Sequence, residues 1–481
     1  MRSPAGCVAW VFTLALLSGI NPTSLMPAEP HPSTEIELGI HEAIARAGDH
    51  SFALRAGEHQ AELARERARL ARRALLPTIG LTYGLSDTVS YGAGDQRERR
   101  IGLDLRAPVY LGGTVSAAIR AEQRRAAEAL QAGSEAHDEL VYTTTVVYLR
   151  LLGARAAMEI QHDLRVIAAR ELAVASRRRE LGELTTQELL AVEIEALAAE
   201  HEYDLAAEGL RRSELEIATQ VGLVRPEEMR VRPRETVRYE YRGMPAEEYR
   251  LERLMAAARE SGTEASLAGE RAAAVDAYRL AHRAAFPRVH VSLGVDAEHG
   301  QHRLREPGIR VGLEVSAPLP AAPISVSMQA AQQGEHTRTR AVSGSAEPGS
   351  NVEYGTSRRT ALLELQIVDE AVETARRTQR QEVLQLNIAR EHAITRADLA
   401  ARAVSLRRQN ADIAAMRRDL GEATHAEYLR AEATVAQARA EARQAVNEIL
   451  ETEVALRRSV GLPLEPLLQA MFVTLSKEDI P

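Results

Sequence analysis

The chain has 481 residues and a formal net charge of −8; 27% of its residues are charged and only 4% are aromatic. Alanine, leucine, arginine and glutamate are abundant, a composition typical of long helices and coiled coils, in which small side chains let helices approach closely. The negative charge weighs against nucleic-acid binding, because a nucleic-acid-binding domain is usually basic. We therefore expect a mainly helical protein with no nucleic-acid partner.

The N-terminus has the pattern of a secretory signal peptide, which we assign to residues 1–28. Arg2 precedes an apolar run at 8–17 that is too short to span a bilayer as a helix, and a cut near Ala28 is expected. The single cysteine, Cys7, lies before this run, so the mature chain would need no disulfide. No later segment has the unbroken apolar length of a transmembrane helix, so any membrane crossing must use strands.

A helix is predicted from Thr34, with Glu37 in the capping-box position, to about Leu76, where Pro77 ends it. Residues 78–86 and 101–109 then alternate between apolar and small or polar side chains. Each segment has about the length that a tilted membrane-spanning strand requires. The sequence therefore predicts a β-hairpin at 77–109, followed by a second long helix from Thr114.

That long helix ends in a stretch that the chain contains twice, at 180–190 and 419–429. Gly182 and Gly421 interrupt helical patterns, and Thr185 and Thr424 follow three residues later. A glycine that closes one helix and a threonine that caps the next, with a glutamate after it, predict a tight helix-turn-helix tip.

Internal repetition extends over the whole chain. The tips are 239 positions apart (421 − 182), whereas the hairpin returns at 287–318, at an offset of 210 (287 − 77). We therefore divide the chain into a first repeat at 29–223, a Pro/Arg-rich linker or equatorial segment at 224–245, a second repeat at 246–462 and a C-terminal tail at 463–481.

The change of offset locates an insertion of 29 residues (239 − 210) between the second hairpin and the second tip. Its expected place is 333–360, because residues 343–351 have the composition of a loop inside what should be a helix. The sequence predicts a flexible excursion there.

The predicted helices and strands require partners. A continuous helix from Gly113 to Gly182 would be about 100 Å long and cannot bury its own apolar stripe. Two strands in each repeat give four strands, whose open edges cannot remain unpaired in lipid. The sequence therefore predicts a barrel closed by several chains and continued by a long helical barrel.

Four short motifs, in order and duplicated, carry a family resemblance. They are Leu75-Leu76-Pro77, the run at 107–113, Leu-Gly-x-x-Thr at both tips, and Val-Gly-Leu at 221–223 and 460–462. Together they resemble the TolC-like outer-membrane efflux proteins over essentially the whole mature chain.

The resemblance implies a homotrimer with a 12-stranded outer-membrane β-barrel, continued by a periplasmic α-helical barrel that is closed at the tips. It implies a passive exit duct of a tripartite efflux or type I secretion system, coupled to an inner-membrane pump and a periplasmic adaptor. The expected location is the outer membrane, in contact with its lipid, with a large periplasmic part.

The resemblance also implies a gate at the tips. Glu427 matches an acidic position that narrows the tunnel, Glu188 is its counterpart in the first repeat, and a second acidic position holds Arg430 here. Arg418 stands where the family ties its helices shut, and we expect it to pair with Glu188. The alternative is that these residues are ordinary exposed helix charges, whose pairs are worth at most about 1 kcal/mol.

The tips are the expected docking surface for the adaptor. The residues assigned to this surface are Leu181, Gly182, Glu183 and Thr185 in the first tip and Leu420, Gly421, Glu422 and Thr424 in the second.

The sequence predicts no cofactor, no metal site and no enzymatic activity. His299 and His302 lie in a predicted external loop, where they flank Gly300-Gln301. No cysteine or carboxylate cluster completes a ligand set, so we interpret them as solvated histidines. No nucleophile elbow or phosphate loop is present in a suitable context. The alternative function is a non-conducting periplasmic coiled-coil scaffold or adaptor, which would not need two matching strand pairs. The exported substrate is not encoded in a recognisable way.

Overall fold

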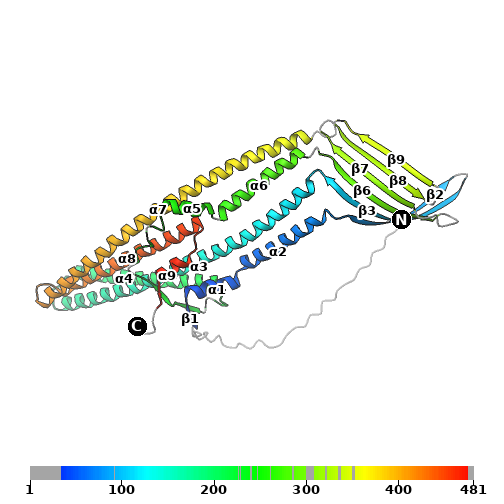
Figure 1. Ribbon diagram of the computed structural model, residues 1–481. Helices are drawn as coiled ribbons and strands as arrows, with labels where there is room; N and C mark the ends of the chain where they lie inside the picture. Colours follow the sequence, from blue (N-terminus) through cyan, green and yellow to red (C-terminus); the bar gives the residue numbers. More distant parts are fainter. Residues whose placement is uncertain are drawn as a thin grey trace, which may run out of the picture.

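The computed structural model describes residues 34–474, apart from 91–92, 226, 228, 239–240, 246, 261, 284–285, 300–307, 320–321, 334–336 and 349–352. The predicted signal peptide, Cys7 and His302 therefore lie outside the described residues. The molecule is elongated: a sheet forms one end, long helices run from it, and both helical tips lie at the opposite end (Figure 1).

Two helices of 67 residues set the length of the molecule. At 1.5 Å per residue, α3 (Thr114–Glu180) and α7 (Glu353–Asp419) are each about 100 Å long. Each turns at a tip into a shorter helix, α4 (Thr186–Gln220) or α8 (His425–Val460). On the sheet side, α2 (Phe52–Arg73) packs along α3, and α6 (Gly262–Arg283) packs along α7. None of the helices in the described ranges has an apolar stretch long enough to cross a membrane.

The start of the first repeat differs from the prediction. Thr34–Leu38 forms strand β1, which pairs in parallel with β4 (Met229–Pro233), and helix α1 begins only at Ile40 and ends at His50. Ser51 then caps α2, accepting a hydrogen bond from the Leu54 amide at 3.3 Å. The local capping pattern at Thr34 was misleading because the linker offers this segment a strand partner, and tertiary pairing overrides local preference.

One sheet at the end of the molecule contains six strands in the order β2-β3-β6-β7-β8-β9, all antiparallel. Their bounds are β2 Thr78–Ser90, β3 Ala93–Leu111, β6 Arg288–His299, β7 Gly308–Pro318, β8 Pro323–Gln333 and β9 Thr337–Ala346. The two predicted hairpins are present as β2–β3 and β6–β7, and β3 pairs with β6 between them.

Strand β9 and the beginning of α7 stand where the sequence predicted a flexible excursion at 333–360, of which 334–336 and 349–352 lie outside the described residues, and β8 lies just before it. Residues 337–346 form β9 instead of a loop, so the chain supplies six strands to the sheet, two more than expected. The hairpin is rich in Ser, Ala, Gly and Gln, which have weak strand preferences. Eleven consecutive register positions with β7 give it a ladder of backbone hydrogen bonds that composition does not reveal.

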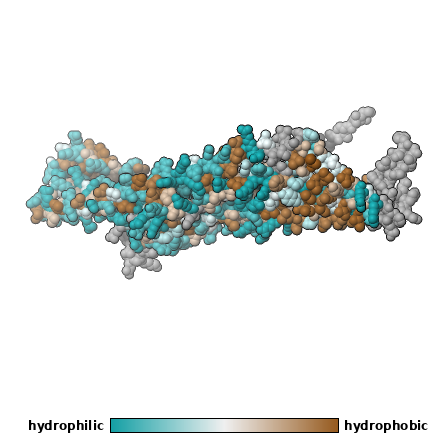
Figure 2. Space-filling model, turned by 45° about the horizontal axis from the view of Figure 1, so that its top comes forward, coloured by the Kyte–Doolittle hydropathy of each residue, from teal (hydrophilic) through white to brown (hydrophobic). Residues whose placement is uncertain are grey.

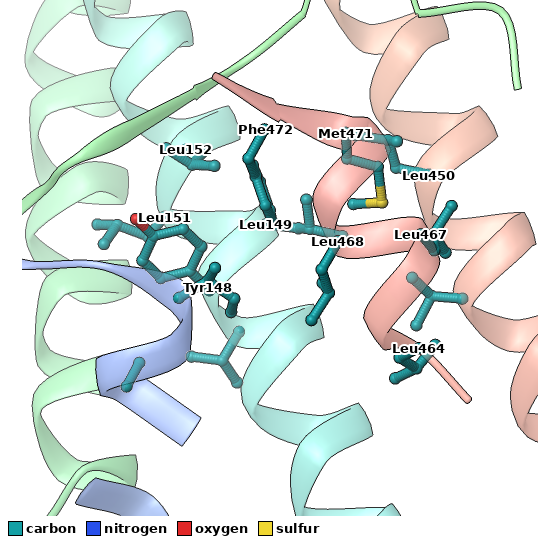
Figure 3. Packing of buried hydrophobic residues seen from close by; sticks show 14 of the residues in the cluster. Tyr148, Leu149, Leu151, Leu152, Leu450, Leu464, Leu467, Leu468, Met471 and Phe472 are labelled. Carbon is teal, nitrogen blue, oxygen red and sulfur yellow. The ribbon is translucent and has the colours of Figure 1, made fainter. Parts of the chain in front are cut away.

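The hydrophobic core lies in the middle of the molecule, where the two repeats meet. Tyr148 and Leu151 of α3, Leu450 of α8, and Leu467 of α9 (Glu465–Met471) are almost completely buried there (Figure 3). Ile449 of α8 is buried in the same cluster. Close by, β5 (Glu235–Val237) pairs with β10 (Phe472–Thr474) at the edge of this core. The segment predicted as a linker and the segment predicted as a tail therefore both fold onto the helices. The repeat boundaries at 29–223 and 246–462 remain predictions.

A buried polar cluster joins the linker to the second repeat. The Glu453 carboxylate on α8 is fully buried and accepts hydrogen bonds from Arg390 of α7 at 2.6 Å, from the Met244 amide at 3.0 Å and from the Tyr241 hydroxyl. Burial and the adjacent carboxylate raise the pKa of Tyr241. Gly243 packs so closely that a Cβ would lie 2.9 Å from both Arg390 and Glu453. The cluster clamps the linker between α7 and α8. The short helix α5 (Leu251–Glu260) follows it.

Candidate functional site

The sheet has two chemically different faces because successive strand residues point to opposite sides. Paired positions place Ile79 of β2, Leu105 of β3, Leu293 of β6 and Val311 of β7 on one face. In the single chain Ile79 is 72% exposed, Leu293 42% and Val311 48%, and Leu105 is partly exposed. Hydrophobic surface gathers over this end of the molecule (Figure 2). Such an apolar band is the surface that a membrane-spanning sheet presents to lipid.

The opposite face is polar and lined with small residues. Gly80, Asp104, Gly294 and Arg310 are paired in register across β2, β3, β6 and β7. A Cβ on Gly294 would lie 2.7 Å from the Asp104 carboxylate, so glycine leaves room for that side chain. On the same face, Arg310 pairs with Asp296 at 3.2 Å. A sheet that is apolar on one face and polar on the other can separate lipid from water.

Both helical tips are built in the same way, as the duplicated sequence predicted. Gly182 and Gly421 have the same backbone angle, φ +78°, in the left-handed region that favours glycine. The Glu183 amide donates to the Arg178 carbonyl at 2.9 Å, and the Glu422 amide donates to the Arg417 carbonyl at 2.8 Å. These bonds close the last turns of α3 and α7 in a Schellman-type arrangement.

The next helices open with complete capping boxes. Thr185 and Glu188 bond reciprocally at the start of α4, and Thr424 and Glu427 do the same at the start of α8. The Glu188 carboxylate accepts from the Thr185 amide at 2.8 Å, and the Glu427 carboxylate accepts from the Thr424 amide at 3.0 Å. The two predicted gate carboxylates are therefore also helix caps, and they lie exposed at the end of the molecule.

Arg418 and Glu188, which we expected to pair with each other, have other partners in this structure. Arg418 pairs with Asp419 at 2.7 Å, and its guanidinium lies 4.3 Å from the centre of the Tyr428 ring. The Tyr428 hydroxyl donates to Glu432 on the same helix. Arg418 thus holds α7 against the first turn of α8. Sequence reasoning missed Asp419 and Tyr428 because their relevance depends on how the two helices meet.

Arg430 connects the two repeats near the tips. Its Nε donates to the Glu171 carboxylate of α3 at 3.2 Å, and the Glu171 side chain is only 11% exposed. The family resemblance led us to expect an acidic residue at position 430. The arginine found there forms an ion pair that joins α8 to α3. The partner of Arg430 could not be identified from sequence spacing, because it is 259 residues away.

The cap at Glu188 makes a testable pH prediction. Hydrogen bonds from Thr185 lower the pKa of the Glu188 carboxyl below its ordinary value. A lowered folded-state pKa means that the cap is fully formed above the ordinary glutamate pKa of about 4.3 and is lost as the pH falls through the lowered value. We expect hydrogen exchange in 183–190, corrected for intrinsic rates, to remain slow at pH 5 and to accelerate only below the ordinary glutamate pKa. A Glu188→Gln variant, which keeps an acceptor but does not titrate, should not show this acceleration.

Within the described part of the chain, no three His, Cys, Asp or Glu side chains gather as a metal site would require. The candidate functional site consists of two surfaces at opposite ends of the molecule. One is the two-faced sheet, and the other is the pair of capped tips.

The fold matches that of solved outer-membrane channels. The structure resembles the outer-membrane channel OprN, with a TM-score of 0.69 and 17% identity over 89% of this chain and 91% of that one. It also resembles the outer membrane protein VceC from Vibrio cholerae, with a TM-score of 0.66 and 17% identity over 88% of this chain and 96% of that one. At these identities the likeness establishes the fold, which is that of the outer-membrane channels.

Sequence comparison adds the family. Residues 43–223 match the family model described as outer membrane efflux protein. Outer membrane efflux protein BepC from Brucella suis biovar 1 (strain 1330) is 32% identical over an alignment of 172 residues that covers 32% of this chain. The match spans 37% of the length of that relative. Residues 43–223 therefore match the outer membrane efflux protein family, in agreement with the resemblance seen in the sequence. The members of this family are transport conduits and not enzymes.

Proposed function

We propose that this chain is the outer-membrane channel of a tripartite efflux or type I secretion system. Three copies close one barrel in the outer membrane, and their long helices form a tunnel through the periplasm. The tunnel is a passive exit duct, coupled to an inner-membrane pump and a periplasmic adaptor. A signal peptide at 1–28 would direct the chain to this location.

The observation that carries the proposal is the combination of a two-faced sheet and helices of about 100 Å in one chain. The sheet has two open edges, and an open edge in hydrocarbon leaves backbone groups unsatisfied at a cost of several kcal/mol each. Closure with other copies removes these edges. The long helices then extend the enclosed space away from the membrane.

The tips supply the proposed gate. Glu427 is exposed at the first turn of α8, where three copies around an axis would bring three carboxylates together. A ring of carboxylates can bind cations and narrow a pore. The Arg418 contacts with Asp419 and Tyr428 hold α7 and α8 together beside this ring.

The tips also supply the proposed docking surface for the adaptor. Leu181 is 62% exposed and Leu420 is 74% exposed, each beside its tip glycine. Glu183, Glu422 and the capping threonines are exposed around them. Two matching apolar side chains at the end of the molecule favour contact with another protein.

The test is single-channel conductance of the membrane-extracted protein in a planar bilayer, comparing wild type, Glu427→Gln and Glu427→Ala. Glutamine preserves the capping box but removes the charge, whereas alanine removes both. We expect discrete openings in wild type and reduced preference for cations in both variants. If both variants retain wild-type cation preference, Glu427 does not line the constriction.

The same experiment addresses the alternative function. Absence of openings in an extracted trimer, under conditions that open related channels, would contradict the exit duct and favour a non-conducting scaffold. A protein recovered as a monomer without detergent would contradict both the barrel and the trimer.

A further inference from the structure

The hairpin β8–β9 continues the membrane sheet without interruption. Its first strand, β8, pairs with β7 without a break, from the pair Gly308 and Gln333 to the pair Pro318 and Pro323. Its second strand, β9, pairs with β8 in the same way, from Ile324 and Ala346 to Gln333 and Thr337. No shift interrupts either ladder. The hairpin therefore lies in the plane of the sheet and is not a loop folded over it (Figure 1).

The two faces of the sheet also continue through the hairpin. Val326 and Met328 of β8 pair with Val315 and Leu313 of β7, and Met328 pairs with Val342 of β9, which extends the apolar face. Met328 is 50% exposed and Val342 is 71% exposed in the single chain. A surface loop would have no reason to keep these side chains on the face that meets lipid.

The other face of the hairpin is polar. The hydroxyls of Ser325 and Ser345 are hydrogen-bonded at 2.7 Å, and so are those of Ser327 and Ser343. The four serines lie on the same face as Glu314 and Ser316 of β7. Alternation of this kind is the pattern of a barrel wall with a polar interior.

The hairpin makes β9, in place of β7, the strand at one open edge of the sheet. In the described residues the sheet ends at β2 on one side and at β9 on the other. The half of β9 nearer the helices, residues 341–346, carries neither a charge nor a proline and so lacks the features with which proteins protect an exposed strand, whereas Arg338 and Arg340 lie in the other half. β2 runs away from α2 and β9 runs back towards α7, so the two edges of neighbouring copies can pair in the antiparallel sense.

We propose that β9 of one copy pairs with β2 of a second copy of this chain, and that all six strands line the pore. This inference rests on the proposed trimer and identifies its membrane interface. Three copies of six strands give 18 strands (3 × 6), six more than the family resemblance implied. With strands about 4.8 Å apart and tilted by about 40°, such a ring is about 36 Å across between backbones, against about 24 Å for 12 strands.

Cysteine pairs test the interface directly. In a Cys7→Ser background, one cysteine is placed on the polar face of β9, at Ser343→Cys or Ser345→Cys. A second is placed on the polar face of β2, at Thr78→Cys, Gly80→Cys or Thr82→Cys. Paired strands bring Cβ atoms to about 4.5–5.5 Å, within reach of a short thiol cross-linker. We expect at least one combination to shift the chain from one to three chain masses on a non-reducing gel.

Two controls define the specificity. Val342→Cys points to the other face of β9 and should not cross-link to the β2 cysteines. Ser316→Cys lies on the polar face of β7, which the hairpin separates from the edge, and should not cross-link either.

The outcomes separate this inference from the proposed function. Cross-linking of Ser316→Cys to β2, without cross-linking from β9, in a protein that light scattering shows to be trimeric, overturns the β9 interface and leaves the channel proposal intact. A monomer in mild detergent overturns both. Covalent trimers from β9 and β2, with both controls negative, support the six-strand wall.

Discussion

A Glu453→Ala variant is expected to lose about 3–5 kcal/mol of folding free energy, because it leaves the Arg390 guanidinium buried without its counter-ion. The Arg390 side chain is only 5% exposed, and Glu453 is its charge partner at 2.6 Å. The same change removes the acceptor of the Met244 amide and the Tyr241 hydroxyl. The measurement is the midpoint of thermal unfolding, followed by circular dichroism of the detergent-extracted protein, together with the rate of proteolysis in the linker at 224–245.

Two further variants test the cause. Glu451→Ala removes an exposed glutamate from the same helix and should change stability by no more than about 0.5 kcal/mol. A double variant, Glu453→Leu with Arg390→Met, removes both charges and should recover part of the loss, since a buried pair replaced by apolar residues is often tolerated. Equal stability of Glu453→Ala and Glu451→Ala would show that the cluster does not clamp the linker.

The second large effect is expected in α9. Leu467 is fully buried in the core that α3, α8 and the linker share, and Leu467→Ala should cost about 2–5 kcal/mol through lost burial and the cavity left behind. Gln469→Ala in the same helix alters an exposed side chain and serves as the control. Both are measured by the shift in the unfolding midpoint. A Leu467→Ala variant as stable as Gln469→Ala would mean that the C-terminal segment is dispensable for the core.

The local sequence was sufficient for the features whose causes are local. Gly182 and Gly421 predict a left-handed helix end, and Thr185 and Thr424 with their glutamates predict capping boxes, because glycine tolerates positive φ and the capping bonds span only three residues. The long helices and the hairpins at 77–109 and 287–318 follow from the period of apolar residues, which changes from 3.6 to 2 at those points.

The tertiary structure decided what depends on partners distant in the chain. Thr34–Leu38 is a strand because β4 pairs with it, and residues 337–346 are a strand because β7 and β8 supply a template for weak strand formers. Arg418 and Arg430 have partners that only helix packing brings within reach, Tyr428 and Glu171. Periodicity identifies which face of an element is apolar, but not which segment covers that face. The number of strands in the sheet of this chain was therefore determined by pairing across the sheet and not by the repeat in the sequence.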